Sequence, residues 1–117
     1  MFHDLNELYF LFESICIKDL LNFADINDMS IYHYQDYNDN EVDVVVKMKG
    51  NDYSFIEIKL EANQINEAAK NLISIKKQIE EDGKIPPKSL IVLVALENKC
   101  YIREDGVIVT PLTMLKN

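Results

Sequence analysis

Two acids and a lysine on two predicted strands are the residues best suited to chemistry. Asp43 lies in one strand, and Glu57-Ile58-Lys59 follows in the next, with thirteen residues between Asp43 and Glu57. Side chains alternate along a strand with a period of two, so Glu57 and Lys59 share one face. A carboxylate and an ammonium group therefore stand side by side, while the alternate apolar residues of that strand are expected to pack on a helix.

The position of Asp43 relative to this pair depends on the turn between the two strands. A three-residue loop at 49–51 places Asp43 opposite Glu57. A four-residue loop instead places Val44 opposite Glu57, although a β-bulge would repair that slip. The sequence leaves both registers open.

A divalent cation would explain why two acids are held together here. Two carboxylates a few ångströms apart repel each other unless a cation lies between them. Mg²⁺, or Mn²⁺ in its place, suits such a site because one or two carboxylates bind it together with waters and phosphate oxygens. An adjacent lysine can hold an attacking water or stabilise the charge that develops on phosphorus. Asp43, Glu57 and Lys59 thus form an apparatus for phosphodiester hydrolysis, although alternate Glu and Lys residues are also common on surface strands.

Glu13 is a further acid in an unusual position. It lies on a predicted helix, and its neighbours three and four residues away on both sides are apolar, namely Tyr9, Phe10, Cys16 and Ile17. A carboxylate on such a stripe needs a partner or a cation. The alternative is that Glu13 lies at the edge of the stripe and reaches water or pairs with Lys18 or Arg103.

Two lysines on a second predicted helix are weaker candidates for substrate binding. Lys70 and Lys77 share a polar helix face with Asn66 and Ser74, and such a face could meet a phosphate backbone. More often a face of this kind is simply solvated.

The elements that must position these residues follow from hydrophobic periodicity and turn signals. We expect a helix at 4–23, strands at 31–35, 41–48 and 53–60, a helix at 64–81 with Asn63 as its N-cap, a strand at 90–96, and a hairpin of strands at 100–103 and 107–110. The apolar strand at 90–96 follows a helix, which indicates a βαβ crossover and a central position in an α/β fold.

Composition limits the classes of function. A chain of 117 residues fits one domain, 1–117, and its 12 Lys and Arg against 20 Asp and Glu give a formal charge of -8. This charge opposes general binding of nucleic acid, so any such contact must be local. No apolar run reaches the roughly 18 residues of a membrane span. Cys16 and Cys100 lie in apolar runs and are expected to be buried thiols of a cytoplasmic protein.

Nearly the whole chain resembles a known nuclease superfamily. The matching stretches are Leu11-Phe12-Glu13-Ser14, Tyr32-His33-Tyr34-Gln35-Asp36, Glu41-Val42-Asp43, Ile56-Glu57-Ile58-Lys59-Leu60, Glu67-Ala68-Ala69-Lys70-Asn71-Leu72 and Tyr101-Ile102-Arg103-Glu104-Asp105-Gly106-Val107. They resemble the PD-(D/E)xK superfamily, which has a restriction-endonuclease-like fold. The chain is most similar to the C-terminal domain, of unsettled function, that follows an AAA-type ATPase domain in a family of bacterial and archaeal P-loop ATPases.

The resemblance assigns roles by motif. It implies that Asp43 and Glu57 are metal ligands, that Lys59 is the catalytic lysine, and that Glu13 completes the metal site. It also implies an AAA-type ATPase domain or protein as partner. Relatives usually carry that ATPase domain ahead of the nuclease-like one, whereas this chain begins just before the first core helix, so either an excised domain or a free-standing version is expected.

Three functional hypotheses remain open at this point. The first is a Mg²⁺-dependent nuclease acting on DNA or RNA. The second is a non-catalytic binding or assembly module that works with an AAA-type ATPase and retains the nuclease fold as a scaffold. The third is a structural charge cluster with nothing bound, in which Lys59 pairs with an acid. A free sheet edge also makes a homodimer plausible.

Overall fold

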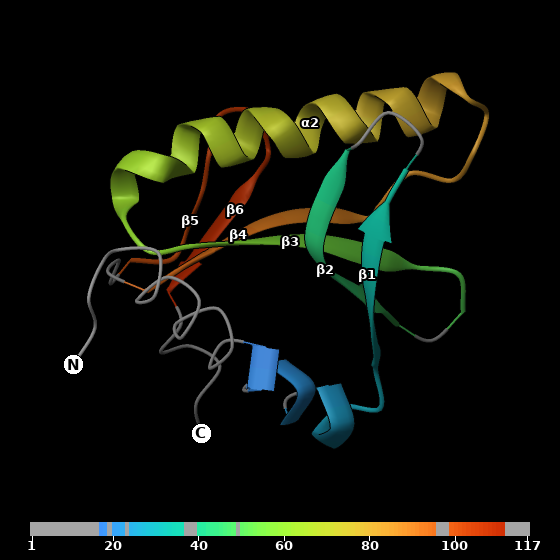
Figure 1. Cartoon of the computed structure of the whole chain (residues 1–117), viewed down its shortest axis with the longest axis horizontal. Coiled ribbons are helices and arrows are strands. Elements are labelled where there is room, and N and C mark those ends of the chain that lie inside the picture. The colour runs from blue at the N-terminus through green and yellow to red at the C-terminus, as the bar shows by residue number, and fades with distance from the viewer. Residues whose placement is uncertain are drawn as a thin grey trace.

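A mixed sheet and a long helix dominate the computed structural model, which describes residues 17–18, 20–22, 24–36, 40–48, 50–95 and 99–111. The sheet has six strands in the order β1-β2-β3-β4-β6-β5 (Figure 1). The elements are β1 (Ser30–Gln35), β2 (Glu41–Lys47), β3 (Tyr53–Lys59), the 3-10 turn η1 (Ala62–Gln64), α2 (Ile65–Glu81), β4 (Ser89–Val94), β5 (Tyr101–Ile102) and β6 (Ile108–Pro111). The predicted α/β class is confirmed.

The strand pairing follows the predicted order. β1, β2 and β3 form an antiparallel meander, and their bounds agree with the predicted ones to within one residue. After α2 the chain returns to the sheet, where β4 pairs in parallel with β3, so the βαβ crossover is confirmed. β6 adds in parallel to β4, and β5 closes the predicted hairpin on the outer edge. The last predicted residue of the strand at 90–96 lies outside the described residues.

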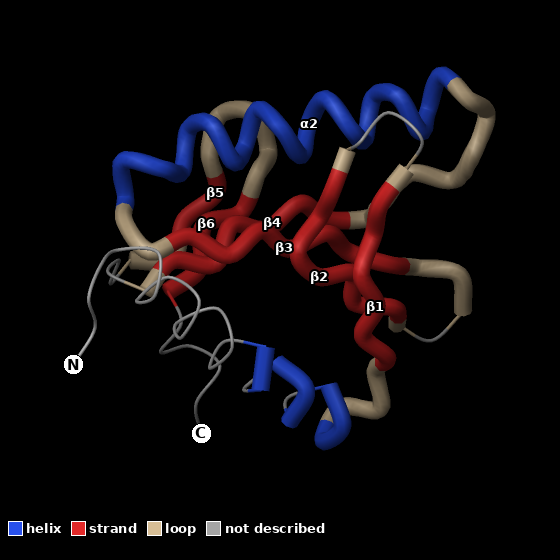
Figure 2. The backbone as a smooth tube through the Cα atoms, viewed as in Figure 1, coloured by secondary structure: helices blue, strands red, loops and turns tan. Residues whose placement is uncertain are grey.

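Helices lie on both faces of the sheet. α2 crosses one face, and the helical residues of the segment 17–26 lie against the other (Figures 1 and 2). The core under α2 includes Val42, Phe55, Ala68, Ala69, Leu72, Ile75, Val92 and Val109, and the core on the other face includes Leu20, Val44, Val46, Ile56, Ile58 and Leu93. β3 is therefore buried on both faces, which restricts its polar residues to positions with a partner. No helix in the described residues has both the length and the apolar character needed to cross a membrane.

β2 contains a β-bulge. Its register with β1 shifts between Tyr32 and Tyr34, so that two residues of β2, Asp43 and Val44, lie opposite one residue of β1. Val44 packs in the core beside the segment 17–26, whereas Val42, two positions earlier, packs under α2. In a regular strand these two valines would share a face. The bulge thus rotates the strand at Asp43, and a bulge of this kind re-aims side chains.

The start of α2 differs from the prediction. The sequence favours Asn63 as the N-cap, but α2 begins at Ile65 with Gln64 at the N-cap, and Asn63 lies inside η1. The prediction of Asn63 is therefore wrong. The reason is that the Gln64 side chain supplies the cap to the turn, because its oxygen accepts hydrogen bonds from the two backbone N–H groups that precede η1.

The N-terminal helix ends later than the sequence predicts. Of the predicted range 4–23, residues 4–16, 19 and 23 lie outside the described residues, and residues 24–26, beyond the predicted end, are helical. Ala24 is buried one turn after Leu20, so it extends the apolar stripe past the predicted end. The backbone then reverses at Asp28, which has φ 59°, and Met29 N donates to the Ala24 carbonyl at 2.7 Å.

The expectation of a buried thiol is wrong for Cys100, which is exposed. Cys100 directly precedes β5, a two-residue strand at the edge of the sheet, where Ile102 is 72% exposed. An apolar run is buried only if another layer covers it, and among the described residues no helix or strand packs over this edge strand. Cys16 lies outside the described residues.

Candidate functional site

Asp43 meets Glu57 where the backbone pairing of β2 with β3 stops. The last paired residues are Val44 and Ile56, which is the register predicted for a three-residue loop. If this register is continued by one residue, Asp43 lies opposite Glu57. Beyond this pair, Oδ2 of Asp43 accepts a hydrogen bond from Ile58 N at 2.9 Å. A side-chain oxygen thus takes the place of a main-chain carbonyl. The bulge in β2 accounts for this geometry, because it bends the strand out of the ladder at Asp43.

Glu57 is a buried acid held against a second acid. Only 6% of the residue is exposed. Burial, first, and then the neighbouring Asp43 carboxylate, which also shares a hydrogen bond with it, together raise the pKa of Glu57 to about 8, although the positive charge of Lys59 opposes the shift. In the metal-free protein at neutral pH, Glu57 therefore holds a proton that a carboxyl group in water would release. A bound cation would replace that proton.

Lys59 and Glu57 line the same polar cavity, at the end of the molecule where α2 begins. The cavity has a volume of about 240 Å³, and its other lining residues come from the first turns of the helix, Gln64, Glu67, Ala68 and Asn71. Lys59 is half-buried and, within the described residues, forms no ion pair shorter than 4.0 Å. Its ammonium group is therefore not committed to Glu57 or Asp43, as the structural hypothesis would require.

Three polar residues of this cavity, Gln64, Glu67 and Asn71, were not among the candidates drawn from the sequence. A signal for them exists, because they recur at i, i+3 and i+7 from the N-cap of α2 and therefore lie on one helix face. That face also carries buried Ala68. The small alanine leaves room for the polar neighbours over the end of β3.

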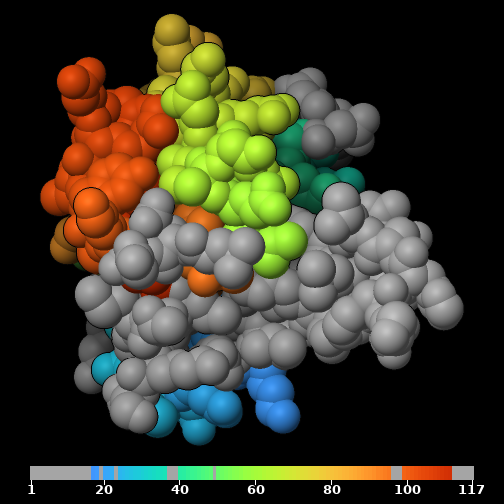
Figure 3. Space-filling view, turned by 90° about the vertical axis from the view of Figure 1, so that its left-hand side faces the viewer, coloured from blue at the N-terminus to red at the C-terminus, as the bar shows by residue number. Residues whose placement is uncertain are grey.

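The hairpin at the end of the chain supports the same helix turn. Arg103 donates from Nη2 to Oδ1 of Asn66 at 2.7 Å and from Nε to the carboxylate of Asp105 at 3.2 Å. Figure 3 looks onto this end of the molecule and shows the first turns of α2 (green) lying against the C-terminal hairpin (orange to red). Arg103 is thus engaged by Asn66 and Asp105, while its predicted alternative partner Glu13 lies outside the described residues.

The residues present suit a hard divalent cation with several waters. The described residues supply two carboxylates, Asp43 and Glu57, and contain no group of three or more His, Cys, Asp or Glu side chains that could hold a metal ion. Mg²⁺ and Mn²⁺ accept one or two carboxylates and complete their shell with water and phosphate oxygens, whereas structural zinc needs four N or S ligands. Glu13, the third predicted ligand, lies outside the described residues.

Sequence comparison assigns the family. Residues 10–115 match the model of DUF4143, described as a domain of unknown function. The chain belongs to the DUF4143 family. No curated protein and no solved structure gave a significant match. Every residue of the candidate site, including Glu13, lies within the matched range, so the site is part of this DUF4143 domain.

The two lysines predicted for substrate binding lie apart from the cavity of the DUF4143 domain. Lys70 and Lys77 are exposed on α2, and neither is among the described residues that line the cavity beside Glu57. Lys70 directly precedes the lining residue Asn71, whereas Lys77 lies nearly two turns further along the helix. Lys59 is thus the cation in the described lining.

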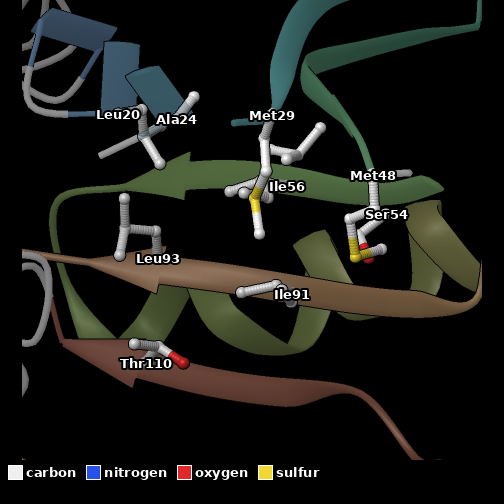
Figure 4. Close-up of a pocket in the computed structure, with 10 residues that line it drawn as sticks. Leu20, Ala24, Met29, Met48, Ser54, Ile56, Ile91, Leu93 and Thr110 are labelled. Atoms are coloured by element: carbon white, nitrogen blue, oxygen red, sulfur yellow. The ribbon is translucent and has the colours of Figure 1, made fainter. Parts of the chain in front are cut away.

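The opposite face of the DUF4143 sheet holds a pocket of a different character. It has a volume of about 230 Å³ and lies between the helical segment and strands β2, β3, β4 and β6 (Figure 4). Its described lining residues are Leu20, Ala24, Met29, Val46, Met48, Ser54, Ile56, Ile91, Leu93 and Thr110. Two hydroxyl groups are the only polar side-chain groups in this described lining, so it offers no acid, base or metal ligand.

Proposed function

We propose that this DUF4143 domain is a Mg²⁺-dependent phosphodiesterase, a nuclease acting on DNA or RNA. The observation that carries the proposal is the meeting of Asp43 and Glu57 where β2 leaves β3, with Lys59 in the same cavity as Glu57. Two acids this close destabilise the fold unless a proton or a cation lies between them. A site for a cation is the simplest reason for a fold to retain them.

The order of elements supports a PD-(D/E)xK architecture for the domain. A helical segment precedes an antiparallel three-stranded meander, and a crossover helix then leads to a strand parallel to β3. In such an architecture the acid of β2 and the E-x-K sequence of β3 would occupy the positions of the metal ligands and the catalytic lysine. An ATPase domain or protein as partner is part of the same proposal, since it comes from the same resemblance.

Each residue has a defined role in the proposed reaction. Asp43 and Glu57 would hold the cation, which when bound supplies Lewis-acid activation of water and neutralises phosphate charge. Lys59 Nζ would position the attacking water or stabilise the charge that develops on phosphorus. Burial of Glu57 strengthens these electrostatic interactions because water screens them less.

Metal titration tests the proposal directly. Mn²⁺ is titrated calorimetrically into chelator-stripped protein at pH 8 and low ionic strength, in the parent, in Asp43→Asn and in Asp52→Asn. Asp52 is an exposed acid at the other end of the β2–β3 pair, so its variant loses the same charge away from the cavity. We expect binding in the parent and in Asp52→Asn and at least tenfold weaker binding in Asp43→Asn. Equal binding in all three would refute the site.

Cleavage is tested next with single-stranded and duplex DNA and RNA in the presence of Mg²⁺ or Mn²⁺. Glu57→Gln and Lys59→Met should each abolish metal-dependent cleavage. Cleavage that survives in either variant would indicate a contaminating nuclease.

A non-catalytic assembly module is the second candidate. The formal charge of -8 favours it, as does the acidic residue Glu67 in the cavity wall, because both repel a phosphate backbone. In this case the parent binds no Mn²⁺ and cleaves nothing. A pull-down with an AAA-type ATPase would then become the informative experiment.

A further inference from the structure

The side-chain amide of Gln64 uses its oxygen in hydrogen bonds, whereas its nitrogen is available to donate to a ligand. Its Oε1 accepts two hydrogen bonds, from Leu60 N and from Glu61 N, each at 3.1 Å. Both partners are N–H donors, so the atom that meets them must be the amide oxygen. The Nε2 group, with two hydrogens to donate, consequently projects away from the end of β3.

The available end belongs to the cavity of the candidate site. Gln64 lines that cavity together with Glu57 and Lys59, and among the described residues Nε2 has no hydrogen-bond acceptor. The side chain is half-buried and is fixed at its oxygen end. An amide anchored in this way presents its donors without the loss of rotamer freedom that a mobile side chain would suffer on binding.

The charges around the cavity indicate what such a donor would bind. Glu57 and Glu67 line the same space, and Lys59 is the cation in its described lining. A phosphate group entering here needs donors beyond one ammonium group. A neutral amide supplies them without competing with the metal ion for Asp43 and Glu57. The volume of about 240 Å³ lies below the roughly 300–1,000 Å³ of sites that enclose whole ligands, so the cavity suits one phosphate and part of its sugar.

We propose that Gln64 is a phosphate-binding residue of this site, which donates from Nε2 to a non-bridging oxygen of a nucleotide phosphate held beside Lys59. The inference rests on the proposed function and adds to it the group that orients the substrate. It also gives the Gln64 side chain a second task, since the same amide that holds the backbone before η1 would contact the ligand.

Three variants separate these two tasks. Gln64→Glu keeps an oxygen for Leu60 N and Glu61 N but replaces the donor group with a second acceptor. Gln64→Met is similar in size and neutral, and it removes both functions. Asn63→Asp makes the same amide-to-acid change at an exposed neighbour outside the described lining of the cavity, so it controls for charge alone.

The probe is thymidine 5′-monophosphate, titrated by NMR into protein saturated with Mg²⁺, with thymidine as the phosphate-free control. A hydrogen bond to a charged group contributes roughly 1.5–3 kcal/mol. We therefore expect affinity to fall about tenfold or more in Gln64→Glu and in Gln64→Met, and less than about twofold in Asn63→Asp. Gln64→Glu should melt within a few degrees of the parent, and Gln64→Met should melt below both, because it leaves the partly buried Leu60 N–H without its acceptor, whereas the exposed Glu61 N–H can bond to water.

The outcomes distinguish this inference from the proposed function. Mg²⁺ binding and equal nucleotide affinity in the parent and Gln64→Glu would overturn the role of Gln64 and leave the metal site standing. Absence of Mg²⁺ binding in the parent would overturn the proposed function and the inference with it. Equal affinity for thymidine and its monophosphate would overturn phosphate recognition here. An added carboxylate favours a cation, so weaker nucleotide binding in Gln64→Glu cannot come from loss of Mg²⁺.

Discussion

Raising the pH should destabilise the metal-free domain through Glu57. Burial and the Asp43 carboxylate raise the pKa of Glu57 from 4.5 to about 8 in the folded state. The folded state therefore binds this proton more tightly than the unfolded chain does, so the contribution is complete below pH 4.5 and is lost as the pH rises through 8. Integrated between pH 6 and pH 9, the loss of unfolding free energy is about 3 kcal/mol.

The variant Glu57→Gln isolates this contribution. Glutamine has the shape of a protonated glutamate and still donates a hydrogen bond to Asp43, but it does not titrate. Urea unfolding of the parent and the variant, with EDTA present, is followed at pH 6, 7, 8 and 9. The parent should lose about 3 kcal/mol more unfolding free energy than the variant across this range, and subtraction removes the contributions of other titrating groups. Glu80 is an exposed acid on α2, so the control variant Glu80→Gln should show the same pH dependence of stability as the parent.

Parallel pH profiles of the parent and Glu57→Gln, within about 0.5 kcal/mol, would refute the reasoning, since surface changes alone fall in that range. The effect of Mg²⁺ on stability tests whether a cation binds at Glu57. Millimolar Mg²⁺ at pH 9 should restore the unfolding free energy of the parent, because the cation takes the place of the lost proton. It should have a much smaller effect on Glu57→Gln, and an equal effect on both proteins would show that the cation acts elsewhere.

Two further predictions concern the scaffold. Phe55→Ala should cost ~3–5 kcal/mol of unfolding free energy in urea, because Phe55 is fully buried with its ring between those of Tyr34 and Tyr53, at centroid distances of 5.2 and 5.5 Å. Ile102→Ala at the exposed edge is the matched control and should cost less than about 0.5 kcal/mol. Gly106→Ala should cost ~1 kcal/mol because Gly106 has φ 88° in the hairpin turn while a Cβ there meets nothing within 4 Å. Unchanged stability of Gly106→Ala would contradict the turn geometry.

Much of the sheet could be predicted from the sequence because its signals are local. Alternation and β-branched residues located β2 and β3, and the Asp105-Gly106 turn located the hairpin. The face shared by Glu57 and Lys59 follows from period two alone, and both residues line the cavity under α2.

The sequence could not predict how Asp43 reaches Glu57. The register with β3 was open between two loop lengths, and the structure has the one that follows from three residues. The bulge that turns Asp43 toward Ile58 N is defined by the pairing of β2 with β1, a strand on its other side. Such a feature depends on three strands at once, so no pattern within β2 reveals it.

Other differences also come from tertiary context. Asn63 has good N-cap chemistry, yet Gln64 caps the turn because its longer side chain reaches back to the end of β3. Cys100 looks like a core residue by its neighbours, yet it borders an edge strand without a covering layer. Glu67 and Asn71 look like surface residues on a helix, and only the position of α2 over the end of β3 makes them part of a cavity.

The anchoring of α2 at both ends decides how the cavity can respond to a ligand. Gln64 ties its start to the end of β3, and near its other end Gln78 Oε1 accepts a hydrogen bond from Asn40 Nδ2 at 3.0 Å, beside the β1–β2 turn. These two contacts lie about four helical turns apart, so together they restrict both translation of α2 along the sheet and rotation of α2 relative to it. The width of the cavity is thus set before any ligand arrives, and binding should proceed by rotamer changes with backbone shifts of less than about 1 Å.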